Sequence, residues 1–173
     1  PAARLRAGIA QTVFSAATDD SRPVLTGVHF GFNGGKLRLA AADGFRLSVH
    51  TMDIDSKVDR QAIVPARALN ELGRLLGEAG ENDVTITFNQ GGTQVQFDVG
   101  HAKLIANLIQ GTFPNYDQLI PANSATRTEV AVNEFMRETR IASIFARDGS
   151  GIVRVIATPG EGGSPGRLTI TAR

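Results

Sequence analysis

The clearest pattern of apolar and polar positions lies in the middle of the chain. Residues 60–65 (RQAIVP) are typical of a short strand, and residues 68–77 (ALNELGRLLG) place their leucines along one face of a helix. Alternating apolar residues then predict strands in DVTITFN and TQVQFDVG, with a turn at Gly91-Gly92 between them, and AKLIANLI predicts one more strand. The predicted order of this unit is strand, helix, strand, strand, strand.

The same order recurs on both sides of this unit with parts missing. Upstream we expect a helix and three strands, in residues 3–14, 24–33, 36–43 and 46–53. Downstream we expect a strand, a helix and two further strands, in residues 128–133 (TEVAVN), 133–146, 151–158 and 167–173. Three copies of one βαβββ unit, of which the outer two are truncated, form an internal repeat. We therefore predict an α+β fold in which helices cover one face of antiparallel sheets.

The dipeptide Asp43-Gly44 separates two of the predicted strands. It predicts the turn of a hairpin, because both residues tolerate the positive φ that a tight turn demands. The residues that follow at once, Phe45-Arg46-Leu47, are not needed by a plain hairpin. They are therefore candidates for a functional role.

Charge and composition limit the classes of function. The 173 residues contain 18 Lys and Arg against 17 Asp and Glu, so the net charge is +1, and cysteine is absent. That charge does not suit a protein whose affinity depends on neutralising many phosphates, and the absence of cysteine excludes disulfides and thiolate nucleophiles. No long apolar run or signal-peptide pattern is present, so we expect a cytoplasmic protein, and a chain that begins with Pro suggests a fragment.

No arrangement of residues points to catalysis. The three histidines stand singly on strand-like segments, and Asp53-x-Asp55 lacks the glutamate that would complete a calcium loop, since Val64 stands there. The glycine-rich stretches lack the Lys-Ser/Thr of a phosphate loop. We expect no catalytic residue, metal or cofactor, although a hydrolase that uses Asp43 and a histidine is a remaining alternative.

Three segments in one order carry a family resemblance: residues 21–27 (SRPVLTG), 36–49 (KLRLAAADGFRLSV) and 108–121 (LIQGTFPNYDQLIP). Together they resemble the bacterial sliding clamp, the beta subunit of DNA polymerase III, and residues 140–146 (RIASIFA) resemble the first helix of that family's next domain. The resemblance implies a DNA-clamp (processivity) fold with three domains of two βαβββ units each. Residues 1–122 would then be the middle domain without its opening strand, and residues 123–173 the first half of the third domain.

The resemblance also implies a function and partners. A clamp is a homodimeric ring that encircles duplex DNA without sequence preference, slides, and tethers DNA polymerase III subunits and other partners, after loading by a clamp loader. It is a processivity factor and not an enzyme. The fragment is expected to self-associate. The alternative is an adaptor of the same fold that binds peptides or proteins but not DNA.

Two sets of site residues follow from the resemblance. The partner-peptide pocket would be formed by Leu25, Gly44, Phe45, Arg46, Leu47, Pro114, Gln118 and Leu119. Ala42, Phe45 and Gln118 replace the family's usual Thr, His and Arg, so the pocket should be more apolar and less basic. The arginines expected to face DNA are Arg4, Arg6, Arg67, Arg74, Arg137 and Arg140. Glutamates on the same helices leave open that these are ordinary solvated helix faces.

Overall fold

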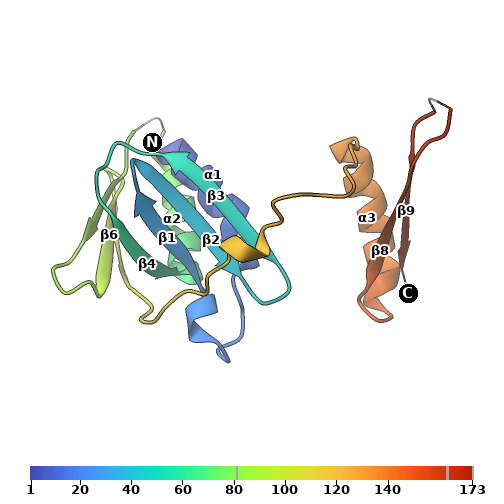
Figure 1. Ribbon diagram of the computed structural model, residues 1–173. Coiled ribbons are helices and arrows are strands. Elements are labelled where there is room, and N and C mark those ends of the chain that lie inside the picture. The colour runs from blue at the N-terminus through green and yellow to red at the C-terminus, as the bar shows by residue number, and fades with distance from the viewer. Residues whose placement is uncertain (81, 163, 173) are drawn as a thin grey trace. The chain divides into compact units, whose positions relative to one another are not determined.

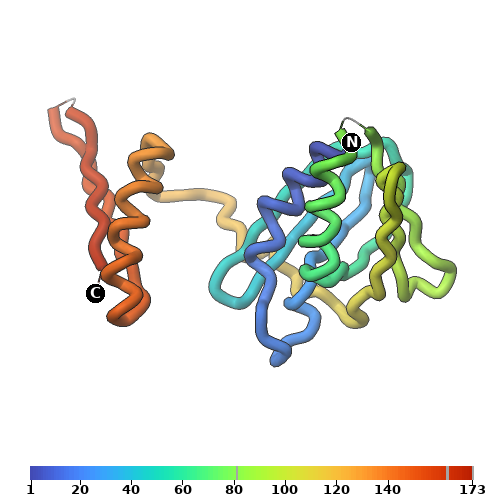
Figure 2. Tube along the Cα trace, turned by 180° about the vertical axis from the view of Figure 1, so that it is seen from behind, coloured from blue at the N-terminus to red at the C-terminus, as the bar shows by residue number. Residues whose placement is uncertain are grey.

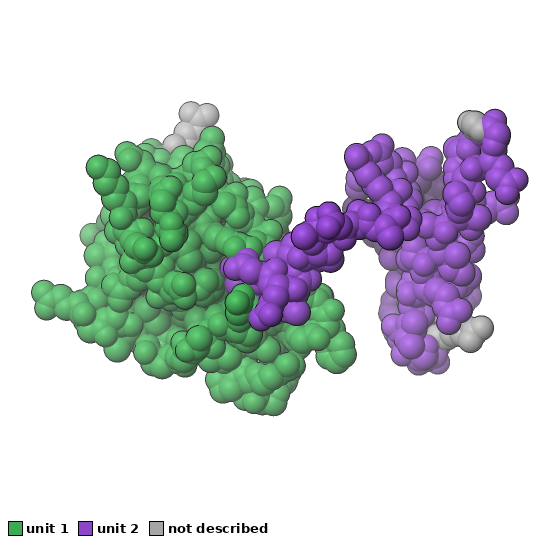
Figure 3. All heavy atoms as spheres, in the orientation of Figure 1, with its two compact units in different colours: residues 1–115 green, residues 116–173 purple. Residues whose placement is uncertain are grey.

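The computed structural model describes residues 1–80, 82–162 and 164–172. The chain divides into two compact units, Pro1–Asn115 and Tyr116–Arg173, which Figure 3 shows in two colours. Each unit is described by itself.

In its described residues the first unit contains two α-helices and two antiparallel sheets (Figure 1). One sheet has the strand order β3-β2-β1-β4 and the other β5-β6-β7. The α+β architecture with antiparallel sheets is thus confirmed, and the middle copy of the repeat has its predicted order. The elements are α1 (Ala2–Thr12), β1 (Gly27–Asn33), β2 (Lys36–Ala42), β3 (Leu47–Asp53), β4 (Arg60–Pro65), α2 (Ala66–Glu78), β5 (Thr85–Phe88), β6 (Gln94–Asp98) and β7 (Lys103–Asn107).

One hydrophobic cluster joins both helices to both sheets. Each helix buries the apolar side chains that lie along one of its faces, among them Leu5, Ile9, Leu69 and Leu72. Phe30 of β1 meets Phe97 of β6 edge-on, with ring centroids 6.2 Å apart, so the two sheets share one core. The helices α1 and α2 lie side by side on one side of the unit (Figure 2).

Two consecutive amides after β7 connect the two sheets. Leu108 donates its N–H to the carbonyl of Thr93, 2.7 Å away, next to β6. Ile109 donates to the carbonyl of Ile63 in β4, 2.9 Å away. The segment that leads out of the first unit is therefore fixed to both sheets.

The turn between β2 and β3 corrects one expectation. The last paired residues of β2 and β3 are Ala42 and Leu47, so Asp43 and Gly44 do begin a hairpin turn. Gly44 has a φ of 92°, but Asp43 is not among the residues at positive φ. The turn needs Gly44 for its backbone conformation, whereas Asp43 contributes through its side chain.

In its described residues the second unit contains one α-helix, α3 (Val132–Arg147), and a hairpin of β8 (Val153–Thr158) and β9 (Arg167–Ala172). A further strand was expected at residues 128–133, and this prediction is wrong. Residues 128–131 have no regular structure, and Val132 and Asn133 already belong to α3. A strand forms only where a neighbour accepts its hydrogen bonds, and no strand of the described residues pairs with this segment.

Candidate peptide site and nucleic-acid interface

The carboxylate of Asp43 organises the turn that carries Phe45 and Arg46. Its Oδ1 accepts hydrogen bonds from the backbone amides of Phe45 (3.0 Å) and Arg46 (3.1 Å). Its Oδ2 accepts a hydrogen bond from Nε of Arg46 at 3.0 Å. The Phe45 amide, with help from Arg46, lowers the pKa of the Asp43 carboxyl below its ordinary value of 3.8.

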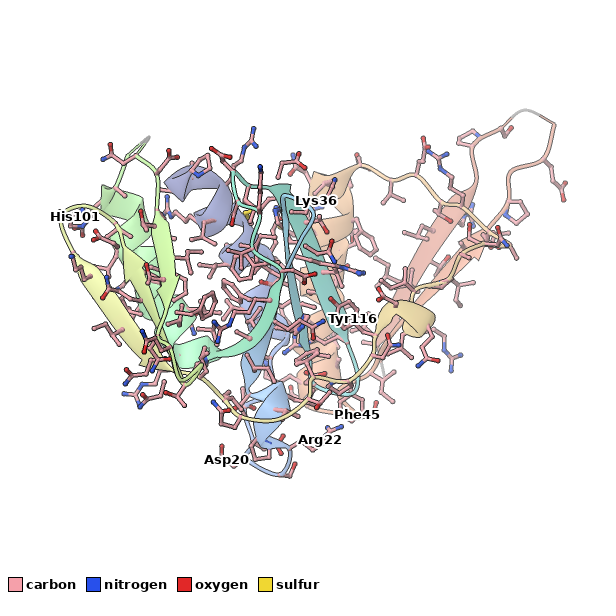
Figure 4. The ribbon with its side chains drawn as sticks, turned by 60° about the vertical axis from the view of Figure 1, so that its left-hand side comes forward. Asp20, Arg22, Lys36, Phe45, His101 and Tyr116 are labelled. Atoms are coloured by element: carbon pink, nitrogen blue, oxygen red, sulfur yellow. The ribbon has the colours of Figure 1, made fainter. Side chains whose placement is uncertain are left out.

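The segment after α1 lies against this turn. Arg22 donates from Nη2 to the carbonyl of Asp43 at 2.8 Å, and Ser15 and Ser48 join their hydroxyls at 2.6 Å. The guanidinium carbon of Arg46 lies 5.7 Å from the ring centroid of Phe14. Figure 4 shows Arg22 and Phe45 at the same end of the unit. Two segments far apart in sequence therefore form one surface.

Most of the predicted pocket residues of the first unit lie in this surface or directly beside it. Leu25 is buried in a short helical turn, η2 (Pro23–Leu25), and its carbonyl accepts the amide of Ala17 at 2.8 Å. Leu47, the first residue of β3, is half-buried. Phe45 is 98% exposed, so it is not a core residue of the hairpin. Pro114 is exposed near the end of the first unit.

The last two predicted pocket residues, Gln118 and Leu119, belong to the second unit. Both lie in a helical turn, η3 (Asp117–Leu119), and both are exposed. The amide of Leu119 donates to the carbonyl of Tyr116 at 3.0 Å, which fixes the turn locally.

Sequence reasoning missed two residues of this surface. Arg22 stands inside the segment SRPVLTG, but no pattern there marks it as a partner of Asp43. Phe14 was counted only as the end of a helix, whereas it lies in the short helical turn η1 (Val13–Ser15) with 56% of its side chain exposed. The exposure of Phe14 is known only from the structure, so the sequence offered no signal for either residue.

The arginines expected to face DNA are all exposed on helices. Arg4 and Arg6 lie on α1, which has no acidic residue. The side chain of Arg6 reaches α2, because its guanidinium carbon lies only 3.5 Å from the position that a Cβ on Gly77 would occupy. Arg67 and Arg74 lie on α2. Arg74 is paired with Glu71 at 3.1 Å.

In the second unit, Arg137 and Arg140 lie on α3. Nε of Arg137 is 2.9 Å from Oε1 of the neighbouring Glu138, so part of its charge is compensated. The positive charge of these helices is therefore modest.

The described residues offer no alternative site of metal chemistry. No group of three or more His, Asp or Glu side chains among them is placed to hold a metal ion. His50 contacts Gln11 at 2.7 Å, His101 contacts Glu78 at 3.7 Å, and His29 stacks on Phe113. Among the helices of the described chain, none is long and apolar enough to cross a bilayer.

Solved structures share the fold. The crystal structure of the DNA polymerase sliding clamp from Bacillus subtilis superposes with a TM-score of 0.81 at 27% identity, covering 99% of this chain and 47% of that one. The sliding clamp from Pseudomonas aeruginosa, solved with a ligand, gives a TM-score of 0.65 at 34% identity, covering 72% of this chain and 34% of that one.

Sequence comparison leads to the same family. The beta sliding clamp of Bacillus subtilis is 34% identical over 157 residues, and that of Staphylococcus epidermidis RP62A is 33% identical over 154. Each alignment covers 88% of this chain and 40% of the relative, so the chain spans about two fifths of the length of these curated relatives. The family model for the central domain of the DNA polymerase III beta subunit matches residues 1–115. The chain therefore belongs to the DNA polymerase III beta subunit family.

Proposed function

We propose that this chain is part of a sliding clamp that encircles duplex DNA and holds replication proteins on it. The observation that carries this proposal, together with the family membership, is the pair of adjacent helices α1 and α2 on one side of the first unit (Figure 2). Their exposed faces carry four arginines, Arg4, Arg6, Arg67 and Arg74, against two glutamates, Glu71 and Glu78.

This modest excess of positive charge suits sliding. Contacts from arginine to phosphate carry no sequence information, so they favour no position along a duplex. Each phosphate that an arginine neutralises adds affinity for DNA, and this affinity falls as the salt concentration rises. A large number of such contacts would hold the protein at one position on the duplex. A closed ring needs little such affinity because it stays on DNA by topology. Arg137 and Arg140 of α3 would be the DNA-facing arginines of the second unit.

The peptide site would be the surface around the turn at residues 43–46. Leu25 and Leu47 would form its apolar floor and Pro114 a wall. Gln118 and Leu119 of η3 would be further peptide contacts, contributed by the second unit. Phe45 and Arg46, both exposed, would contact a bound peptide at the rim. A short peptide needs this combination, since apolar pockets supply binding energy and a few polar groups orient it.

The partners follow from this function. The complete protein would be a homodimeric ring placed on DNA by a clamp loader, and it would bind DNA polymerase III subunits in the cytoplasm. Its role would be to keep a polymerase on its template and not to catalyse a reaction.

The second unit supports a further proposal about the chain by itself, namely self-association. In the first unit two repeats share one core, but the second unit contains α3 with only one hairpin. Several large apolar side chains are therefore exposed there, and Ile141 and Phe145 of α3 line a groove of about 690 Å³ with Leu168 and Ile170 of β9. A second copy would cover these apolar side chains.

A chimera tests the proposed clamp function. This chain would replace the matching segment of the Bacillus subtilis clamp, and retention of the chimera would be measured on nicked circular DNA before and after linearisation. We expect retention on the circle and loss from free ends. A matched chimera in which Arg4, Arg6, Arg67 and Arg74 are alanine should load less efficiently. A chimera that forms dimers but is released equally from both DNA forms would refute the proposal.

A further inference from the structure

The guanidinium of Arg46 is held by two groups from different parts of the first unit. On one side the Asp43 carboxylate accepts its Nε–H at 3.0 Å. Against it lies the ring of Phe14, with the centroid 5.7 Å from the guanidinium carbon, within the range of a cation–π interaction. The hydrogen bond uses Nε, which leaves the two terminal NH2 groups of Arg46 as donors for a ligand.

Phe14 has no evident role in the core. Its side chain is 56% exposed, whereas the next residue, Ser15, is fully buried. Ser15 binds the hydroxyl of Ser48 in β3 at 2.6 Å, and this contact fixes the backbone that carries Phe14 beside the hairpin. An exposed aromatic ring next to a fixed anchor is suited to hold a neighbouring side chain rather than to fill a core.

We propose that Phe14 is a positioning residue of the peptide site, which orients Arg46 so that its terminal NH2 groups face a carboxylate or backbone carbonyl of the bound peptide. Arg46 has several rotatable bonds, and ordering such a side chain on binding costs affinity. Phe14 and Asp43 order it beforehand, so the peptide finds its donors in place. This inference rests on the proposed peptide site, and it adds to that site a residue and a preference for an acidic ligand.

The first test needs no ligand. Arginine side-chain NMR on the full chain would follow the Arg46 Nε–Hε signal and its exchange with water in the unaltered protein, in Phe14→Leu and in Phe14→Tyr. Phe14→Leu keeps an apolar side chain but removes the π-face, so we expect a changed Arg46 shift and faster exchange. Phe14→Tyr should restore both values. Unchanged Arg46 signals in Phe14→Leu would overturn the proposal.

The second test measures recognition. The probes are two fluorescent hexapeptides that share two leucines and a phenylalanine, one with an aspartate and the other with an asparagine at the same position. Phe14→Leu should weaken binding of the aspartate peptide about 2- to 5-fold, as expected for an exposed cation–π contact, and reduce its preference over the asparagine peptide. Leu47→Ala should weaken both peptides equally, because the apolar floor does not distinguish them.

The outcomes separate this inference from the proposed function. If the unaltered chain binds the peptides but Phe14→Leu lowers both affinities equally, Phe14 is a packing residue and the inference is wrong while the peptide site stands. If the unaltered chain binds neither peptide, the proposed site is wrong, and the role of Phe14 in recognition falls with it.

Discussion

Arg22 and Asp43 are joined across 21 residues of sequence, because Nη2 of Arg22 donates to the backbone carbonyl of Asp43 at 2.8 Å. This bond links the segment after α1 to the turn between β2 and β3. It also brings the Arg22 guanidinium close to Gly44, the residue next to Asp43. Gly44 has a φ of 92°, and a Cβ placed on it would lie 2.9 Å from Nη1 of Arg22.

Gly44→Ala should therefore destabilise the first unit more than a comparable glycine change elsewhere. Gly34→Ala is the matched control, since Gly34 also has a positive φ, 55°, but a Cβ there would meet nothing within 4 Å. The control should cost about 1–2 kcal/mol of unfolding free energy from backbone strain alone. Gly44→Ala should add up to about 1 kcal/mol from the displaced Arg22 bond. Urea unfolding measures both, and equal losses would show that the bond contributes nothing.

The free energy of unfolding should depend on pH through the ionisation of Asp43. Its hydrogen bonds from Phe45 and Arg46 lower the pKa of the folded state below 3.8, so the ionised form stabilises the fold. This contribution is fully present above the unfolded pKa and is lost as the pH falls through the folded pKa. Asp19 and Asp98 also have lowered pKa values, so the comparison must be with Asp43→Asn.

The difference in unfolding free energy between the unaltered chain and Asp43→Asn should be constant above about pH 5 and shrink below about pH 4. Urea unfolding at a series of pH values gives this difference. A difference that does not change between neutral pH and about pH 3 would contradict the proposed role of the carboxylate.

The chain alone should bind duplex DNA weakly. Its net charge is +1, and some helix arginines are paired with glutamates, so few phosphates can be neutralised. We expect dissociation constants in the non-specific range, about 10⁻⁴ to 10⁻⁶ M, with weaker binding at higher salt. Fluorescence anisotropy with a labelled duplex measures this. A salt-sensitive dissociation constant well below about 1 µM would contradict this prediction. It would mean that electrostatic affinity, and not a closed ring, holds the protein on DNA.

Self-association should depend on the exposed apolar side chains of α3. Sedimentation velocity over increasing protein concentration should show a dimer, and Phe145→Asp should abolish it by placing a charge in the groove of the second unit. Phe45→Asp is the control, since Phe45 is even more exposed but lies in the first unit. A monomer at all concentrations, or equal effects of the two changes, would refute the proposed interface.

Periodicity predicted the elements whose side chains are buried in a shared core. Leu69, Leu72 and Leu76 of α2 and the alternating Val95 and Phe97 of β6 are buried as their spacing indicates. The same alternation in residues 128–133 predicted a strand wrongly, because a strand also needs a pairing partner. Periodicity reports which face of an element is apolar, but it does not report what lies opposite that face.

Less of the candidate site than of the fold could be predicted from the sequence. Asp43-Gly44 correctly marked a turn, but the role of Asp43 comes from hydrogen bonds of its side chain rather than from its own φ. The contact between Phe14 and Arg46 spans 32 residues, and no spacing rule connects positions so far apart. Only the folded chain brings such pairs together. Phe45, Arg46 and Leu47 stood out in the sequence because they follow the turn, whereas Leu25, Pro114, Gln118 and Leu119 became candidate peptide-site residues through family resemblance.

The two amide hydrogen bonds after β7 have a mechanical consequence. Because Phe113 stacks on His29, Ile109 is bonded to Ile63 and Leu108 to Thr93, tension applied to the chain beyond residue 115 meets these three contacts before it reaches β7. Such a pull would thus be divided between β1, β4 and the β6 hairpin instead of peeling β7 away from its neighbour. The segment after β7 therefore carries a pulling force in place of the hydrogen bonds between β6 and β7.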